Sequence, residues 1–157
     1  GSPNVVYVQD LMDEWLGKDA ARVILPITDP YVVHHGALGS FAVVYLPQGT
    51  TAAEAAAKLK AMPGIEAALN REEAAARFEL PADRLGDLIV VSTKHKALGT
   101  SAARHALSGL TEPLRSHGGI SEQRVPLICN RKLADGAAAS KRWRNFDAFD
   151  LALNHAQ

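Results

Sequence analysis

His117 is the side chain in this sequence whose surroundings best suit chemistry. It lies in Arg115-Ser116-His117-Gly118-Gly119, a polar run in which two glycines follow the histidine. Glycines let a backbone bend and approach other groups closely, and a loop leaves an imidazole accessible. Imidazole is a common metal ligand and exchanges protons near neutral pH. Because one histidine cannot make a metal site alone, we expect this chain to hold only part of an active site.

Two adjacent histidines form a second candidate, in the glycine-rich run His34-His35-Gly36-Ala37-Leu38-Gly39-Ser40. Such a loop could bind a metal or a phosphate. Neighbouring side chains point in different directions in extended backbone, however, and rarely share one ion. The Gly-Lys-Ser/Thr of a phosphate loop is also missing. We therefore expect a tight structural turn between two strands, with a role near a substrate as the alternative.

Other charged groups have plainer explanations. Lys94-His95-Lys96 and Arg104-His105 could steer an anionic substrate, although surface-loop charge explains both equally simply. Asp29-Pro30 is typical of a turn. The basic run Lys141-Arg142-Trp143-Arg144 is typical of a solvated helix face. None of these clusters alone defines a reaction.

The elements that position these residues alternate between helices and strands. Capping signals occur at Thr51-Ala52-Ala53-Glu54 and at Asn70–Glu73, whereas Gly17 and Pro63-Gly64 are typical helix ends. Helices are expected within 5–17, from 51 to 62, from 70 to about 78 and over 141–154. Strands are expected at 23–25, 41–46, 65–68, 88–92 and 125–129.

The strand from Leu88 to Ser92 has no polar alternation, which predicts that both its faces are covered, as in a central parallel strand. The His117 loop follows it, and ligands gather at the carboxyl ends of strands in open α/β sheets. Residues 97–113 are expected to form a looser stretch. The strand at 125–129 is expected to be buried. The last helix is expected to dock through Trp143, Phe146, Phe149 and Leu153.

Composition excludes several classes of function. Seventeen Lys and Arg balance seventeen Asp and Glu, which argues against nucleic acid or an anionic membrane as a partner. No stretch approaches the roughly 20 apolar residues of a membrane span. Cys129, the only cysteine, is expected to be a small core residue and suits a cytoplasmic protein. Gly1-Ser2 without an initiator Met is typical of a cleaved tag, so we expect a piece of something longer.

The runs Leu25–Ser40, Gly99–His105 and Leu114–Gly119 resemble the phosphonoacetate hydrolases of the alkaline phosphatase superfamily. The run from Leu25 to Ser40 is the most specific, and Gly99–His105 followed by Leu114–Gly119 adds to it. Residues 86–92, 116–119 and 125–128 are also similar to the C-terminal part of that superfamily's hydrolases in general. The resemblance covers nearly the whole chain.

The resemblance implies an α/β fold with a partial alkaline phosphatase-like core. Residues 1–19 would be a core remnant, and residues 87–157 would supply the C-terminal core strands, the His-Gly loop and the C-terminal helix. Residues 20–86 would form a small α+β subdomain similar to the cap that overhangs the active site in this family. Exposed sheet edges would favour a homo-oligomer.

The same resemblance implies a reaction. These enzymes cleave the carbon–phosphorus bond of phosphonoacetate, a small anionic phosphonate, to acetate and phosphate. They use two zinc ions, a threonine nucleophile and scattered Asp and His ligands. Of these residues only the histidine of a Ser-His-Gly motif carries over, onto His117. The nucleophile and the other ligands precede a segment similar to Asn4–Tyr7, so the resemblance implies a C-terminal portion that is inactive alone.

Two alternatives stay open. A nucleotide pyrophosphatase or phosphodiesterase-like hydrolase shares the Gly-Asp strand and the His-Gly loop. Residues 20–92 could instead be a ferredoxin-like module that binds a small molecule without catalysis. The roles of the other histidines and of Arg104 are not assigned by any of these hypotheses.

Overall fold

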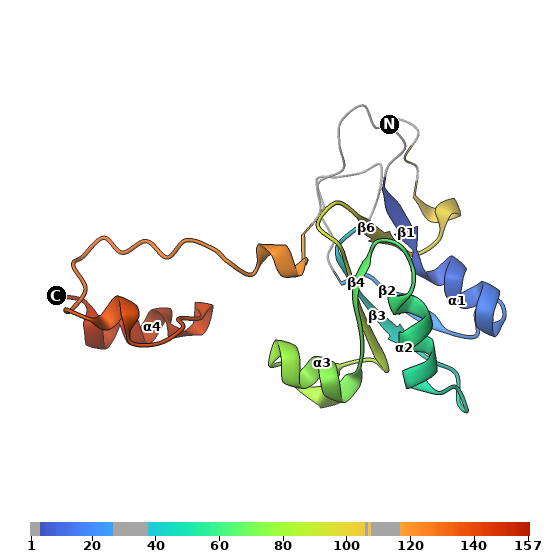
Figure 1. The fold of residues 1–157 in the computed structure, drawn as a ribbon, viewed down its shortest axis with the longest axis horizontal. Helices are drawn as coiled ribbons and strands as arrows, with labels where there is room; N and C mark the ends of the chain where they lie inside the picture. The colour runs from blue at the N-terminus through green and yellow to red at the C-terminus, as the bar shows by residue number, and fades with distance from the viewer. Residues whose placement is uncertain (1–3, 27–37, 106, 108–116) are drawn as a thin grey trace. The chain divides into compact units, whose positions relative to one another are not determined.

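The computed structural model describes residues 4–26, 38–105, 107 and 117–157 of the chain. Contacts divide the chain into an N-terminal unit, residues 1–123, and a C-terminal unit, residues 124–157. The helices and strands of the N-terminal unit carry the candidate site. They form a mixed α/β arrangement with one antiparallel and one parallel sheet (Figure 1). The subdomain boundary expected near residue 86 stays a prediction.

The larger sheet has four strands in the order β2-β3-β5-β4. All its pairings are antiparallel, so the prediction that 88–92 belongs to a parallel sheet is wrong. The predicted burial of that strand is confirmed, since every residue of β5 is buried. Its strands are β2 (Arg22–Ile24), β3 (Phe41–Tyr45), β4 (Ile65–Asn70) and β5 (Leu88–Ser92).

A second, two-stranded sheet pairs β1 (Val5–Tyr7) in parallel with β6 (Ala97–Gly99). The pairing joins segments about ninety residues apart, with Val5 opposite Ala97. The expectation of loose structure from residue 97 onward is therefore wrong at its start. Gly39 also forms an isolated bridge with Leu98, which brings the chain before β3 against β6.

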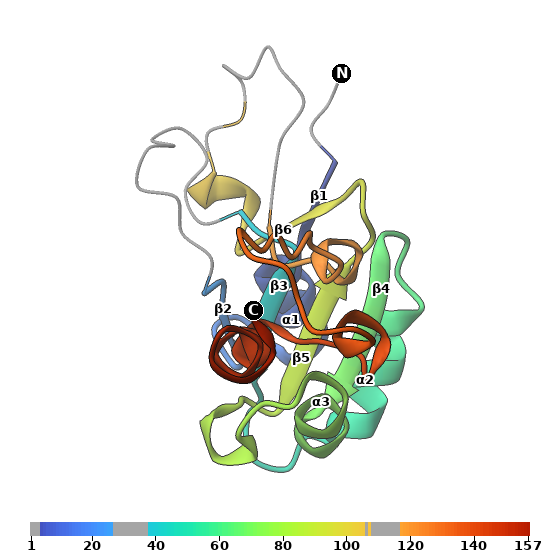
Figure 2. The same cartoon turned by 90° about the vertical axis from the view of Figure 1, so that its left-hand side faces the viewer.

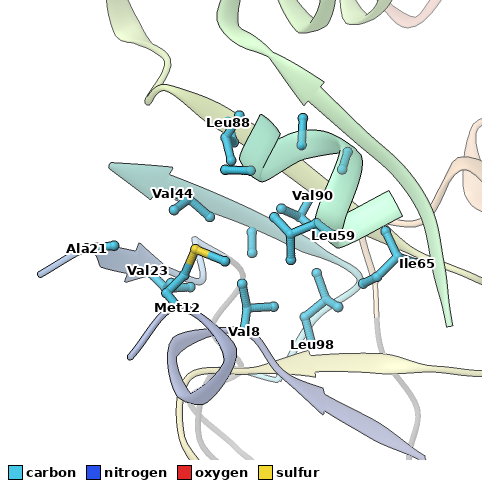
Figure 3. Close-up of a cluster of buried hydrophobic side chains, with 14 of the residues drawn as sticks. Val8, Met12, Ala21, Val23, Val44, Leu59, Ile65, Leu88, Val90 and Leu98 are labelled. Carbon is cyan, nitrogen blue, oxygen red and sulfur yellow. The ribbon is translucent and has the colours of Figure 1, made fainter. Parts of the chain in front are cut away.

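The two faces of the larger sheet are covered by different helices. On one face, α1 (Val8–Leu16) and α2 (Ala52–Lys60) pack against the inward side chains of the strands. Figure 3 shows Leu59 beside Val90, and Met12 beside Val23. On the opposite face, α3 (Arg71–Phe78) packs against Ile89, and Figure 2 views the sheet with α3 in front and α1 behind. This two-sided cover explains why β5 lacks polar alternation.

Three of the four helix-end signals in the sequence agree with the structure, including the end of α2 at Lys60, shortly before Pro63-Gly64. The Asn70 side chain accepts a hydrogen bond from the Glu73 N–H, and the Glu73 carboxylate accepts one from the Asn70 N–H, which confirms the predicted capping box. Gly17 ends α1 with a φ of 99°, as predicted. At Thr51 the predicted helix start is confirmed, since α2 begins directly after this residue. The predicted capping box is wrong, because the Thr51 side chain makes no cap hydrogen bond.

Gln9 protects one edge of the larger sheet. Its side chain accepts a hydrogen bond from Val23 N–H and donates one to the Ala21 carbonyl, each at 2.9 Å. An amide side chain thus occupies one N–H of edge strand β2 and the carbonyl of the residue before the strand, groups that another strand could otherwise pair. Oligomer formation through exposed sheet edges stays a prediction.

The C-terminal unit differs most from the sequence-based expectations. Residues 125–129 form no strand, and Val125, Leu127 and Ile128 are 73%, 53% and 87% exposed. Cys129 is also exposed rather than buried. Pro126 lacks the N–H that a ladder position needs, and no described strand lies beside the run. An apolar run alone therefore mispredicted both strand and burial.

The last helical segment begins later than expected. It comprises a 3₁₀ turn at Asn145–Asp147, α4 at Ala148–Asp150 and a π-helical turn at Leu151–His155. Leu151 is buried and Trp143 is half-buried, whereas Phe146, Phe149 and Leu153 are exposed. Docking of this helix onto the rest of the chain through Trp143, Phe146, Phe149 and Leu153 stays a prediction.

Replacing Gly86 by alanine is expected to lower the free energy of unfolding by about 1–3 kcal/mol, the usual cost of overpacking. A Cβ there would lie 2.5 Å from Val43 Cγ1 and 2.7 Å from the Val44 carbonyl oxygen. Urea denaturation measures the change. Gly119→Ala is the matched control, because its Cβ would meet nothing closer than 3.4 Å. Equal stability of the two variants would contradict the close packing of Gly86 on β3.

Candidate functional site

His117 lies on an exposed loop that is folded back on itself by Glu122. The His117 side chain is 81% exposed, and its Nδ1 lies 3.0 Å from Glu122 Oε1. The Gly118 N–H donates to Glu122 Oε2 at 2.7 Å. Gly118 has a φ of 93°, a left-handed conformation that favours glycine. The loop thus turns at Gly118 and enters a 3₁₀ turn at Ile120–Glu122.

Backbone hydrogen bonds attach this loop to the larger sheet. The Ser40 N–H donates to the His117 carbonyl at 2.7 Å, and the Ser92 N–H donates to the Ser40 carbonyl at 2.9 Å. Ser92 is the last residue of β5, and Ser40 directly precedes β3. Ser40 is buried, so this link is shielded from solvent. His117 therefore lies by the carboxyl end of β5, as the sequence suggested.

Glu122 is the charged group that sets the electrostatics of the loop. The hydrogen bond with His117 holds the pKa of the Glu122 carboxyl below its ordinary value, against a smaller opposing effect of burial, with help from the Gly118 and Gly119 backbone. Because a carboxylate only accepts hydrogen bonds, Nδ1 is assigned as the protonated nitrogen. The lone pair of the neutral ring then lies on Nε2, which no described contact engages.

Sequence reasoning did not single out Glu122. Its position three residues after Gly119 is the spacing at which an acidic side chain reaches back to the N–H groups before a helical turn. That signal is present in the printed sequence, but the usual Ser or Thr of a capping box is replaced by glycine. This spacing could have indicated Glu122 as a hydrogen-bond acceptor for the His117 ring.

His105 is structural rather than a surface charge. It is 8% exposed, its Nε2 accepts a hydrogen bond from the Thr100 N–H at 3.0 Å, and its ring stacks on Tyr7 at 6.1 Å between centroids. The Thr100 carbonyl in turn accepts from the Gln9 N–H. Interpretation of Arg104-His105 as one positive surface cluster is therefore wrong for the histidine, while Arg104 is exposed.

The remaining candidates are scattered over the chain. His34, His35 and Asp29 lie outside the described residues. Lys94 and His95 are exposed between β5 and β6, whereas the Lys96 ammonium donates to Asn4 Oδ1. In the C-terminal unit, Lys141 forms an ion pair with Asp147 at 2.9 Å. Within the described residues of the N-terminal unit, Lys94, His95 and Lys96 form no hydrogen bond or ion pair with His117.

Glu122 also lines an apolar hollow of about 310 Å³ on the α3 side of the sheet. Phe41, Phe78, Leu80, Val91 and Ile120 supply its apolar walls. These walls do not suit a small dianion. Among the described residues, no cluster of three or more His, Cys, Asp or Glu side chains is arranged to hold a metal ion. A single histidine does not by itself complete a metal site.

No described helix combines the length and the apolar character that a membrane crossing requires.

Comparison with known proteins relates the chain to one kind of enzyme. No protein-family model matches it. Two crystal structures of phosphonoacetate hydrolase from Sinorhizobium meliloti 1021, with phosphonoformate and with phosphonoacetate, are 59% identical and cover 94% of the chain. Their TM-scores are 0.76 and 0.75. A phosphonoacetate hydrolase from Penicillium oxalicum is 54% identical over 41 residues, 24% of this chain.

The chain spans only part of these relatives. It covers 36% and 35% of the two bacterial structures and 57% of the fungal protein. The resemblance inferred from Leu25–Ser40 and from the His117 loop is thus confirmed at the level of sequence and fold. With 59% identity over almost all of its residues, the chain is a relative of phosphonoacetate hydrolase that corresponds to 36% of that protein's length.

Proposed function

We propose that this chain is the C-terminal portion of a phosphonoacetate hydrolase and contributes His117 as one ligand of an active-site zinc. The whole protein would cleave the carbon–phosphorus bond of phosphonoacetate to give acetate and phosphate. The proposal is supported by the 59% identity to an enzyme solved with phosphonoacetate and with phosphonoformate. The observation that carries it is the geometry of His117, whose Nδ1 is bonded to a carboxylate while its ring is 81% exposed.

This geometry is the one that a ligating histidine needs. Metal-binding histidines usually donate the N–H of the second ring nitrogen to a carboxylate, a carbonyl or a water, which fixes the tautomer and the ring. His117 does so through Nδ1, which leaves the Nε2 lone pair for the metal. When bound, zinc would stabilise the negative charge that develops on the phosphonate oxygens during cleavage.

The proposal has a consequence for the 157-residue chain itself. One histidine alone binds zinc only weakly. The threonine nucleophile and the other zinc ligands would come from the rest of the protein. The chain alone should therefore release no phosphate from phosphonoacetate. The complete product of the gene should do so in the presence of zinc, and its failure with phosphonoacetate would contradict the proposed substrate.

A zinc titration of the chain tests the ligand assignment directly. We expect weak binding by calorimetry that His117→Ala removes, because this variant deletes the only described imidazole with an open Nε2 beside a supporting carboxylate. His95→Ala is the matched control, since His95 is also exposed but lies between β5 and β6. Zinc binding that survives His117→Ala would contradict the assignment.

A further inference from the structure

We propose that Glu122 is a positioning residue that holds His117 in the Nδ1-protonated tautomer and directs its Nε2 toward the metal. The inference rests on the proposed function, which supplies the zinc, and it assigns a role to Glu122. Its basis is one carboxylate that makes two different hydrogen bonds. Oε1 lies 3.0 Å from the ring Nδ1, and Oε2 lies 2.7 Å from the Gly118 nitrogen.

The two bonds couple the ring to the backbone that carries it. The Gly118 N–H belongs to the residue directly after His117, so Glu122 fixes the peptide and the imidazole at once. The His117 carbonyl is held from the other side by the Ser40 N–H at 2.7 Å. The left-handed Gly118 makes the return of the chain to Glu122 possible. One hydrogen bond thus holds the ring, and two others hold the backbone next to it.

The chemistry of the carboxylate determines the tautomer. A carboxylate accepts hydrogen bonds and donates none, so both of its partners must be donors. The Gly118 N–H is always a donor, and Nδ1 is one only when it carries the proton. Zinc binds the unprotonated nitrogen of a neutral imidazole, which is then Nε2. Removal of such a supporting partner typically lowers metal affinity about 10–100-fold.

Glu122→Gln keeps the hydrogen bond to the Gly118 backbone but changes the partner of the His117 ring, because the amide offers one oxygen and one NH2 group. The Gly118 N–H requires the oxygen, so the NH2 group faces Nδ1 and makes it an acceptor. The proton then moves to Nε2, the nitrogen that would bind zinc. We expect long-range ¹H–¹⁵N spectra of the metal-free chain, recorded in mildly alkaline buffer, to show this change of tautomer.

With the same substitution in the complete gene product we expect zinc affinity to fall about 10–100-fold by calorimetry. Glu66→Gln is the matched control, since it removes the same charge from an exposed position on β4. It should change neither the His117 spectrum nor the zinc affinity. Glu122→Asp retains the carboxylate with a shorter reach, and we expect it to keep the Nδ1-protonated form with intermediate affinity.

Two results would overturn the proposal. One is a wild-type His117 that carries its proton on Nε2 in the metal-free chain. The other is Glu122→Gln with the wild-type tautomer and wild-type zinc affinity. The proposed function fails separately, if His117→Ala leaves zinc binding intact. The tautomer in the metal-free chain still tests Glu122 in that case, because that measurement involves no metal.

Discussion

His117→Ala in the complete gene product is expected to lower phosphate release from phosphonoacetate more than 100-fold. Loss of a residue that only supports a metal-binding histidine typically costs about 10–100-fold, and loss of the ligand itself should exceed that range. A metal site with a missing ligand binds its ion less tightly and holds it less firmly in place. The turnover rate under saturating substrate and the bound zinc per protein measure the two effects.

Stability should be almost unaffected by the same change. The His117 side chain is 81% exposed, and exposed substitutions usually alter the free energy of unfolding by less than about 0.5 kcal/mol. Gln123→Ala, an exposed change in the same loop, is the matched control and should keep full activity. Wild-type turnover of His117→Ala with wild-type zinc content would exclude His117 as a ligand.

Local signals predicted the parts of the fold that depend on neighbouring residues. The capping box at Asn70 and Glu73 needs only a four-residue segment, and the burial of β5 follows from its own side chains. Accessibility of His117 followed from the glycines beside it. Each of these features is decided within a few residues, which is the range over which spacing and residue type carry information.

Pairing between distant segments was not predictable in the same way. β5 was placed in a parallel sheet because burial on both faces is typical of parallel strands, yet helices on both sides bury an antiparallel strand equally well. β6 is three residues long, too short for a periodic pattern, and its partner β1 lies near the other end of the unit. Strand direction and partner depend on long-range contacts that the local pattern does not contain.

The run at 125–129 shows a second limit. Its apolar residues indicate that burial would be favourable, but they do not specify the surface that buries them. In the described C-terminal unit Ile128 remains 87% exposed. The site shows a similar distinction, because the histidine was identified from its loop, whereas the contact between Glu122 and the His117 ring is seen only in the folded turn.

Leu59→Ala is expected to lower the free energy of unfolding of the N-terminal unit by about 2–5 kcal/mol. The Leu59 side chain is fully buried between α2 and the larger sheet, next to Val90 (Figure 3). Truncation removes three carbons from a packed cluster and leaves a cavity that neighbouring side chains fill only in part. Since domains are stable by only about 5–15 kcal/mol, this change should shift the urea midpoint strongly.

The two tryptophans allow this effect to be assigned to one unit, because Trp15 lies on α1 and Trp143 lies in the C-terminal unit. In a Trp143→Phe background, fluorescence during urea denaturation reports only on Trp15, which packs against the same cluster as Leu59. Leu153→Ala is the matched control: its side chain is 82% exposed, and the Trp15 transition should move by less than about 0.5 kcal/mol. If Leu59→Ala lowers the free energy of unfolding no more than Leu153→Ala does, the packing of α2 on β5 is contradicted. The larger sheet, from which the hydrogen bonds to Ser40 and His117 extend, would then need a different core.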